Sequence, residues 1–171
     1  MTGPVLHGER VRLRPAGPDD RDGLRDILAQ PSVARWWGPG SPEEHADAWL
    51  EEDPECTVLA IEVDGAVAGS IQFREEPDED YRHASIDVFL SAAHQGRGLG
   101  TDAIRTVARH LFAARGHHRI TIDPSAANAA AIRAYRSVGF REVGVMRRYE
   151  RGPDGTFHDG LLLDLLEGEL T

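Results

Sequence analysis

Apolar residues recur along the chain at two spacings, and these spacings predict its elements. Spacings of three and four residues, which form one face of a helix, mark four segments that begin near residues 20, 41, 101 and 128. Alternation or a short apolar run marks strands at residues 11–14, 57–63, 66–73, 84–90, 119–122, 142–150 and 157–166. Two helices precede most of the strands, and two more are inserted among them, which indicates an α+β fold.

The order of these segments predicts a mixed, mostly antiparallel central sheet of six to seven strands with helices on both faces. Asp64-Gly65 and Pro153-Asp154-Gly155 are turn sequences, and each joins two strands into a hairpin. No internal repeat or low-complexity linker interrupts the pattern. We therefore interpret residues 1–171 as a single domain.

The most informative segment is Gln95-Gly96-Arg97-Gly98-Leu99-Gly100, which lies between the predicted strand 84–90 and the predicted helix 101–114. A glycine-rich loop that opens a helix leaves backbone N–H groups unpaired, and these groups bind anions together with the positive end of the helix dipole. Glycine also lets the backbone approach a phosphate closely. The segment therefore predicts a cradle for a pyrophosphate.

Three kinds of glycine-rich loop bind such a group. The ATPase loop requires a lysine after its last glycine, and all 19 basic Lys or Arg residues of this chain are arginine. The dinucleotide fingerprint requires a third glycine where Thr101 stands, although Asp123 lies at about the right distance to bind a ribose. That alternative stays open. The third pattern, Gln-x-x-Gly-x-Gly, is matched by Gln95, Gly98 and Gly100 without adjustment.

Composition narrows the class of partner. The 29 acidic and 19 basic side chains give a formal net charge of −10, which disfavours nucleic acid and favours either a cationic partner or simply solubility. The single cysteine, Cys56, allows no intrachain disulfide, and the chain has neither a leader nor an apolar run of membrane-spanning length. We expect a cytoplasmic protein with no membrane partner, as either a monomer or a homodimer.

The Gln-x-x-Gly-x-Gly pattern resembles the pyrophosphate loop of the GNAT acyltransferase superfamily. A second run from Asn128 to Phe140, Asn-x-x-Ala-x-x-x-Tyr-x-x-x-Gly-Phe, resembles another hallmark of that superfamily. The resemblance implies a GNAT-like fold, with acetyl-CoA as co-substrate and no metal. It implies cofactor contacts from Phe89, Leu90, Gln95, Gly96, Arg97, Gly98, Leu99, Gly100, Thr101 and Asn128. Phe89 and Leu90 would pair their backbone with the pantetheine arm.

Two residues are candidates for proton transfer. The resemblance places the Tyr135 hydroxyl near the thioester sulfur, as the general acid that protonates the departing thiolate; packing alone would also explain a tyrosine on this face. Asp87 interrupts the apolar strand 84–90, and a carboxylate there is costly to bury unless it is paired or faces a cleft. We predict that Asp87 is the base or an ammonium anchor; the alternative is a structural carboxylate.

Within the superfamily, the chain is most similar to the aminoglycoside 6′-N-acetyltransferases. The resemblance implies that Asp123 binds a substrate ammonium and that a tryptophan of the pair Trp36-Trp37 lines the acceptor site. We expect one tryptophan to be buried and the other exposed. If the strands ending near Leu90 and Ile122 are parallel neighbours, Asp87 and Asp123 meet in one crevice.

The acidic run that includes Glu79 and Asp80 fits either a lip that attracts a polycation or a solvated loop. His117-His118 has no partner at metal-ligand spacing and is interpreted as surface.

The predicted function is acetyl transfer from acetyl-CoA to a primary amine of a small cationic molecule. Alternative acceptors are a hydroxylysine-type siderophore precursor and a protein N-terminus. The alternative to an enzyme is a module that senses acyl-CoA.

Overall fold

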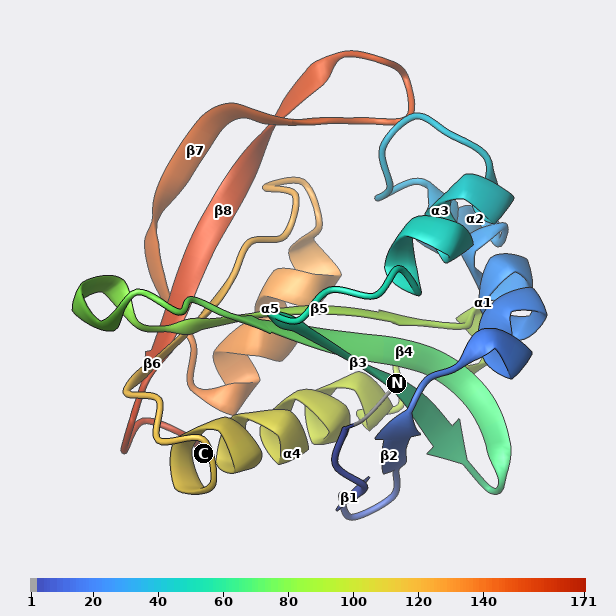
Figure 1. Ribbon diagram of the computed structural model, residues 1–171. Helices are drawn as coiled ribbons and strands as arrows, with labels where there is room; N and C mark the ends of the chain where they lie inside the picture. The colour runs from blue at the N-terminus through green and yellow to red at the C-terminus, as the bar shows by residue number, and fades with distance from the viewer. Residues whose placement is uncertain (1–2) are drawn as a thin grey trace.

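The computed structural model describes residues 3–171 and contains one twisted sheet with helices against both faces (Figure 1). The strands are β1 (Leu6–His7), β2 (Arg12–Pro15), β3 (Cys56–Val63), β4 (Ala66–Glu75), β5 (Ala84–Leu90), β6 (Arg119–Ile122), β7 (Arg141–Arg151) and β8 (Phe157–Leu166). The α-helices are α1 (Arg21–Leu28), α2 (Pro31–Ala34), α3 (Pro42–Trp49), α4 (Leu99–Ala113) and α5 (Ala129–Val138). Short 3-10 helices are η1 (Pro18–Asp20), η2 (Glu79–Tyr81) and η3 (Ala92–His94).

The sheet has the strand order β1-β2-β3-β4-β5-β6-β8-β7, and every neighbouring pair is antiparallel except β5 and β6. It has eight strands within residues 3–171, and the expectation was six to seven. The additional strand is β1, which spans two residues and pairs with β2. Two residues are too few to show an alternation of apolar and polar side chains, so the sequence pattern could not reveal it.

Strand residues of opposite parity supply two separate cores, one on each face of the sheet. On β3, Leu59 and Ile61 pack into the core covered by α4 and α5, whereas Val58 and Ala60 pack into the core covered by α1, α2 and α3. This alternation follows from the period of two along a strand. On β5 it sends Ile86 to the first core and Phe89 to the second, so the side chain of Asp87 points toward the α1–α3 side.

The parallel strands β5 and β6 separate soon after they meet. They pair where Ala84 faces Ile120 and where Ser85 faces Thr121. β5 then continues to Leu90 as the partner of β4, whereas β6 ends at Ile122. The edge of β5 from Ile86 onward therefore has no strand beside it on the β6 side, in the part of the chain that the structure describes. The carboxyl ends of two diverging parallel strands form a crevice where ligands bind in many α/β proteins.

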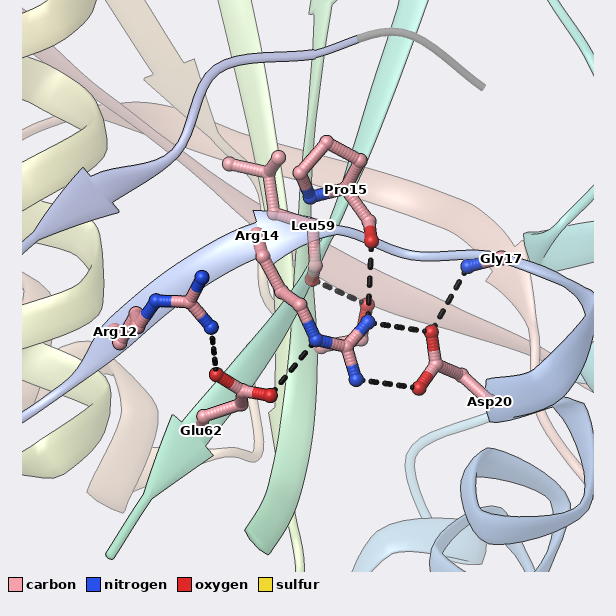
Figure 2. A network of polar contacts seen from close by, with 8 residues as sticks. Arg12, Arg14, Pro15, Gly17, Asp20, Leu59 and Glu62 are labelled. Carbon is pink, nitrogen blue, oxygen red and sulfur yellow. Dashed lines mark hydrogen bonds and ion pairs between the residues drawn. The ribbon is translucent and has the colours of Figure 1, made fainter. Parts of the chain in front are cut away.

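A polar network fixes the amino-terminal helix to the sheet (Figure 2). The Arg14 guanidinium on β2 donates to both carboxylate oxygens of Asp20, at 2.8 Å each, and to Glu62 on β3 at 2.7 Å. Asp20 also accepts the backbone N–H of Gly17 at 2.9 Å. Because the Arg14 guanidinium favours the ionised form of Asp20, it holds the pKa of that carboxyl below its usual value. Asp20 thus precedes α1 and also pairs with Arg14.

Candidate active site

The glycine-rich loop and the start of α4 form an open cluster of backbone donors. Gly96 and Gly98 adopt left-handed conformations, with φ of 69° and 74°. The Asp102 N–H donates to the Gly98 carbonyl at 3.0 Å and so begins the helical ladder. The N–H groups of Leu99, Gly100 and Thr101 precede that bond and point out of the helix end. The local geometry is that of an anion site.

This loop lines a cavity of about 580 Å³. Five loop residues line it, namely Gln95, Gly96, Gly98, Leu99 and Gly100, together with Thr101. Phe89 and Leu90 of β5 and Asn128 at the start of α5 form further wall. The expected cofactor residues therefore lie around one space, with the exception of Arg97. The Arg97 side chain lies outside this cavity, and its carbonyl accepts a bond from Arg10 near the β1–β2 turn.

Two of these side chains are already engaged in positioning the backbone. Gln95 donates its amide N–H to the Leu90 carbonyl at 2.9 Å and to the Ser32 hydroxyl at 3.2 Å, which ties the loop to the end of β5. Asn128 accepts the Ala131 N–H at 3.2 Å and caps α5. The sequence motif thus marks residues that shape the cavity as well as line it.

A second cavity, of about 670 Å³, lies on the other side of the same wall. Trp36, Trp37, Val88, Asn128 and Tyr135 line both cavities. Within residues 3–171, six acidic residues line the second cavity, and three of them come from different strands or strand ends: Asp87 of β5, Asp123 after β6 and Glu150 of β7. The expected convergence of Asp87 and Asp123 is what the parallel β5–β6 pair produces.

The Asp87 side chain is exposed to the second cavity, and the walls of that cavity surround it. This enclosure raises the pKa of the Asp87 carboxyl, and the nearby charge of Asp123 raises it further. Gln72, directly opposite on β4, donates an amide N–H to Asp87 at 3.1 Å and opposes the rise in pKa. A carboxylate with a raised pKa is a better proton acceptor near neutral pH than an ordinary aspartate.

Tyr135 projects from α5 to the wall shared by the two cavities. Its side chain packs in the first core, and the residue is 8% exposed. Its hydroxyl has no hydrogen-bond partner among residues 3–171. Burial raises the pKa of Tyr135 well above its usual value, and the charges of Asp87 and Asp123 add to the rise. The phenol therefore keeps its proton at neutral pH and can donate it to a group in either cavity.

Asp123 receives a partner that the sequence did not indicate. The Tyr149 hydroxyl on β7 donates to the Asp123 carboxylate at 2.6 Å. This bond, followed by burial, raises the pKa of Tyr149 to about 12. Glu150, the next residue, lines the cavity, and burial raises the pKa of its carboxyl with contributions from the charges of Asp123 and Asp87.

The two adjacent tryptophans share one environment, which corrects the expectation that one is buried and the other exposed. Both are half-buried and both line the two cavities. Trp37 makes edge contacts with Trp49 and Phe89, at ring-centroid distances of 5.4 and 5.6 Å. The ring of Trp36 lies under the Arg35 guanidinium at 4.6 Å. They follow the four-residue helix α2, so neither the helical nor the strand period assigns them to opposite sides.

Of the two interpretations of the acidic run, the structure favours the solvated loop, because Glu79 and Asp80 do not line the second cavity and form no lip around it. Glu79 and Asp80 belong to η2 and are exposed, and Glu79 lines a separate hollow with Arg115 and His117. The acidic rim is instead formed after α3, by Glu51, Glu52 and Asp53.

The structure changes or refines the interpretation of two further residues, His117 and Cys56. His117 is buried, at 2% exposed, and bonds Glu75 at 2.8 Å, whereas His118 is exposed. The expectation of two surface histidines is therefore wrong for His117. Cys56 lines the second cavity, but burial raises the pKa of its thiol, which disfavours the nucleophilic thiolate.

Sequence reasoning missed Gln72, Tyr149 and Glu150. Gln72 could have been found from the pairing of β4 with β5, because that register sets residue 72 opposite Asp87. No local signal marks Tyr149 or Glu150. Glu150 reaches the cavity and Tyr149 reaches Asp123 where β7 has a register shift between Met146 and Glu150, which the sequence pattern does not display.

Comparisons with known proteins agree with this geometry. The family model of the acetyltransferase (GNAT) domain matches residues 10–141. The aminoglycoside N(6′)-acetyltransferase type 1 of Klebsiella pneumoniae is 30% identical over 167 residues, covering 86% of this chain and 80% of that protein. The spermidine N(1)-acetyltransferase of Escherichia coli K12 is 27% identical over 143 residues, covering 78% of this chain and 74% of that protein.

Solved structures show the same fold. RimJ of Mycobacterium smegmatis, in complex with a CoA-disulfide, superposes with a TM-score of 0.86 at 24% identity, covering 98% of this chain and 89% of that one. No helix within residues 3–171 is long and apolar enough to cross a bilayer.

Proposed function

Because this chain belongs to the GNAT acetyltransferase family and is an acyltransferase, we propose that it transfers the acetyl group of acetyl-CoA to a primary amine of a cationic small molecule. The first candidate acceptor is the 6′-amine of an aminoglycoside. The observation that carries the proposal is the pair of cavities that share Tyr135, Val88 and Asn128. The first cavity has the anion cradle and suits acetyl-CoA. The second cavity has the carboxylates and suits the cationic acceptor, and we call it the acceptor cavity.

The chain's residues fit acetyl-CoA as the donor. The pyrophosphate would accept bonds from the N–H groups at the start of α4, and the pantetheine arm would lie along the edge of β5 that lacks a neighbouring strand after Ser85. A larger side chain in the cradle would intrude, because a Cβ on Gly100 would lie 3.2 Å from the Leu90 side chain. When bound, acetyl-CoA supplies an activated acetyl thioester.

Proton transfers are assigned to two residues on opposite sides of the shared wall. Asp87 accepts a proton from the acceptor ammonium, directly or through a water, which leaves a neutral amine to attack the acetyl carbon. Tyr135 donates its proton to the departing sulfur. The raised pKa of each group suits its role, because Asp87 gains affinity for a proton while Tyr135 stays protonated.

Several features support a cationic acceptor. Asp87, Asp123 and Glu150 line the acceptor cavity, and its one arginine, Arg74, already pairs with Asp53 at 2.7 Å. The 30% identity to an aminoglycoside acetyltransferase supports the choice of first candidate. We further infer a cytoplasmic location, which the lone cysteine favours.

The test is a thiol-release assay with acetyl-CoA and three acceptors in parallel, namely kanamycin, hydroxylysine and a peptide with a free N-terminus. We expect release with kanamycin and a product heavier by one acetyl group at the 6′-amine. Release with the peptide or hydroxylysine alone would overturn the acceptor assignment. Acetyl-CoA binding by calorimetry with no release for any amine would overturn the proposed transfer to these amines and favour a sensor of acyl-CoA.

A further inference from the structure

The carboxy-terminal hairpin of β7 and β8 contributes Glu150 to the lining of the acceptor cavity. Figure 1 shows its turn reaching the loop between α2 and α3, where a Cβ on Gly38 would lie 3.2 Å from the Arg151 carbonyl. β7 departs from regular strand geometry at Arg148, which has a positive φ of 49° and whose N–H donates to Asp159 at 2.8 Å. The hairpin thereby becomes a wall of the site.

Backbone bonds attach this wall to the loop that carries Asp123. The Leu161 N–H donates to the Pro124 carbonyl and the Ala126 N–H to the Asp159 carbonyl, each at 2.9 Å. The Tyr149 hydroxyl completes the attachment by its bond to Asp123 at 2.6 Å. The position of Glu150, which follows Tyr149, is therefore fixed relative to Asp123.

The Glu150 carboxylate lines the cavity without a hydrogen-bond or ion-pair partner among residues 3–171. The charges around it come from several elements: Asp87 and Asp123 raise its pKa, whereas His158 on β8 lowers it. Arg74 on β4 is occupied by Asp53. An unpaired carboxylate beside two others is unfavourable by itself, and a cation placed among them would relieve the repulsion.

An independent observation shows that the same cavity is shaped for a ligand. The Tyr135 hydroxyl opens onto it from a side chain that is more than nine-tenths buried, and it has no partner within the described residues. The hydroxyl oxygen itself is accessible, since among the described residues only His117 Nδ1 is a fully buried side-chain polar atom without a partner. It is therefore free to hydrogen-bond to a ligand in the cavity.

We propose that Glu150, held by the Tyr149–Asp123 bond, forms a second ammonium subsite, so that the acceptor must carry two amino groups. One nitrogen lies between Asp87 and Tyr135 and receives the acetyl group. The other stays protonated and pairs with Glu150. The acceptor class is thus a small diamine or polyamine, which includes amino sugars with several amines. This inference rests on the proposed transfer and adds a residue that selects the acceptor.

The test compares kcat/KM for 1,4-diaminobutane and 4-amino-1-butanol, which match in length and differ by one ammonium group. We expect the native protein to prefer the diamine by about tenfold or more, the size of effect that a charge-assisted hydrogen bond gives. Glu150→Gln keeps the shape of the side chain and removes its charge. It should abolish most of that preference by lowering kcat/KM for the diamine toward the value for the amino alcohol.

Glu167→Gln is the matched control, because it removes one negative charge from an exposed residue that does not line the cavity. It should leave the diamine preference unchanged. Tyr149→Phe frees Asp123 and should raise the KM for the diamine more than it lowers kcat. Thermal melting checks that each variant is folded.

Equal rates of the two acceptors with the native protein, or an unchanged preference in Glu150→Gln, would overturn the subsite and leave the acetyl transfer intact. A lack of thiol release with every amine would instead count against the proposed function. A peptide N-terminus acetylated faster than either small amine and insensitive to Glu150→Gln would also overturn the subsite.

Discussion

Tyr135 and Asp87 have opposite proposed roles in proton transfer, as proton donor and proton acceptor, although the pKa of both is raised. Burial raises the pKa of both, yet a raised pKa keeps a phenol protonated and makes a carboxylate a better base. The assigned roles follow from that difference. We expect Tyr135→Phe to lower kcat by about 100-fold or more, the usual contribution of a positioned general acid, with little change in the KM for acetyl-CoA. Steady-state thiol release measures both constants.

Cys56→Ala is the control for Tyr135→Phe. Cys56 lines the same acceptor cavity, but its thiol has a raised pKa and no assigned chemical role. Its replacement should therefore leave kcat unchanged. A normal kcat in Tyr135→Phe would exclude the acid role, and a large loss in Cys56→Ala would point to an acyl-enzyme path through the thiol.

Gln72 provides a way to test whether Asp87 titrates during the reaction. Its amide N–H donates to Asp87 at 3.1 Å and thereby lowers the pKa of that carboxyl. A base must be ionised, so kcat/KM falls as the pH drops through the pKa of Asp87. Gln72→Leu removes the opposing hydrogen bond, and the acidic limb of the kcat/KM profile should move to higher pH.

Cys56→Ala is the matched comparison for Gln72→Leu, because Cys56 contacts the amide oxygen of Gln72 and not its N–H group. The Cys56 thiol contacts the Gln72 carbonyl oxygen at 3.5 Å, so Cys56→Ala leaves the bond to Asp87 in place. The acidic limb of the kcat/KM profile of Cys56→Ala should therefore coincide with that of the native protein. If the limb of Gln72→Leu also stays in place, Asp87 is not the group that titrates.

At the scale of single elements, the spacing of apolar residues predicted those helices and strands whose formation depends on residues near one another in the sequence. The helical segments expected to begin near residues 41 and 128 are α3, which begins with a capping box at Ser41 and Glu44, and α5, which ends at Gly139 with φ of 115°. What periodicity could not predict depends on distant pairing. The shift in β7 that brings Glu150 to the cavity arises from its fit to β8, and the four-residue α2 is too short to show a helical period.

The start of α4 allows a direct test of the pyrophosphate cradle. Gly98 has φ of 74°, and a Cβ there would lie 3.1 Å from the Arg10 guanidinium. Gly98→Ala should strain the loop by about 1 kcal/mol and turn its N–H groups away from the ligand. We expect the KM for acetyl-CoA to rise about tenfold while the KM for the amine changes little.

Gly65→Ala is the control for the backbone strain itself. Gly65 has a similar φ of 80°, lies in the turn between β3 and β4 and has open space around its position. It should lower the melting temperature by a comparable amount without affecting the KM for acetyl-CoA. Equal effects of Gly98→Ala and Gly65→Ala on that KM would mean that the loop does not bind the pyrophosphate.

At the scale of the whole molecule, the site lies where two cores meet across one sheet. α4 and α5 supply the donor side, and the layer of α1, α2 and α3 supplies Trp36 and Trp37. The sequence could predict helices on both faces, because strand alternation requires cover on each side. It could not predict that the acidic rim comes from residues 51–53 after α3, since a charge run carries no information about which cavity it faces.

The layer of α1–α3 packs on the sheet through its apolar core and also through the ion pair of Arg14 with Asp20, and this polar part depends on pH (Figure 2). Arg14 lowers the pKa of Asp20 and is also the largest cause of the lowered pKa of Glu62. A carboxyl whose pKa is lower in the folded state stabilises the fold above its unfolded pKa, near 4. That stabilisation is lost as the pH falls through the folded value.

Arg14→Leu should therefore lower the free energy of unfolding by about 2 kcal/mol at pH 7, because Asp20 is 8% exposed and would be left without its cation. The difference from the native protein should narrow below pH 4, where Asp20 becomes protonated. Urea titrations at pH 7, 5 and 3.5 measure this difference in the free energy of unfolding.

Arg12→Leu is the control, because it breaks only a more exposed pair with Glu62, at 2.5 Å, and should cost less than about 0.5 kcal/mol. A difference between Arg14→Leu and the native protein that stays constant with pH would show that Arg14 acts through packing of its stem, and that the ion pair with Asp20 does not hold this layer.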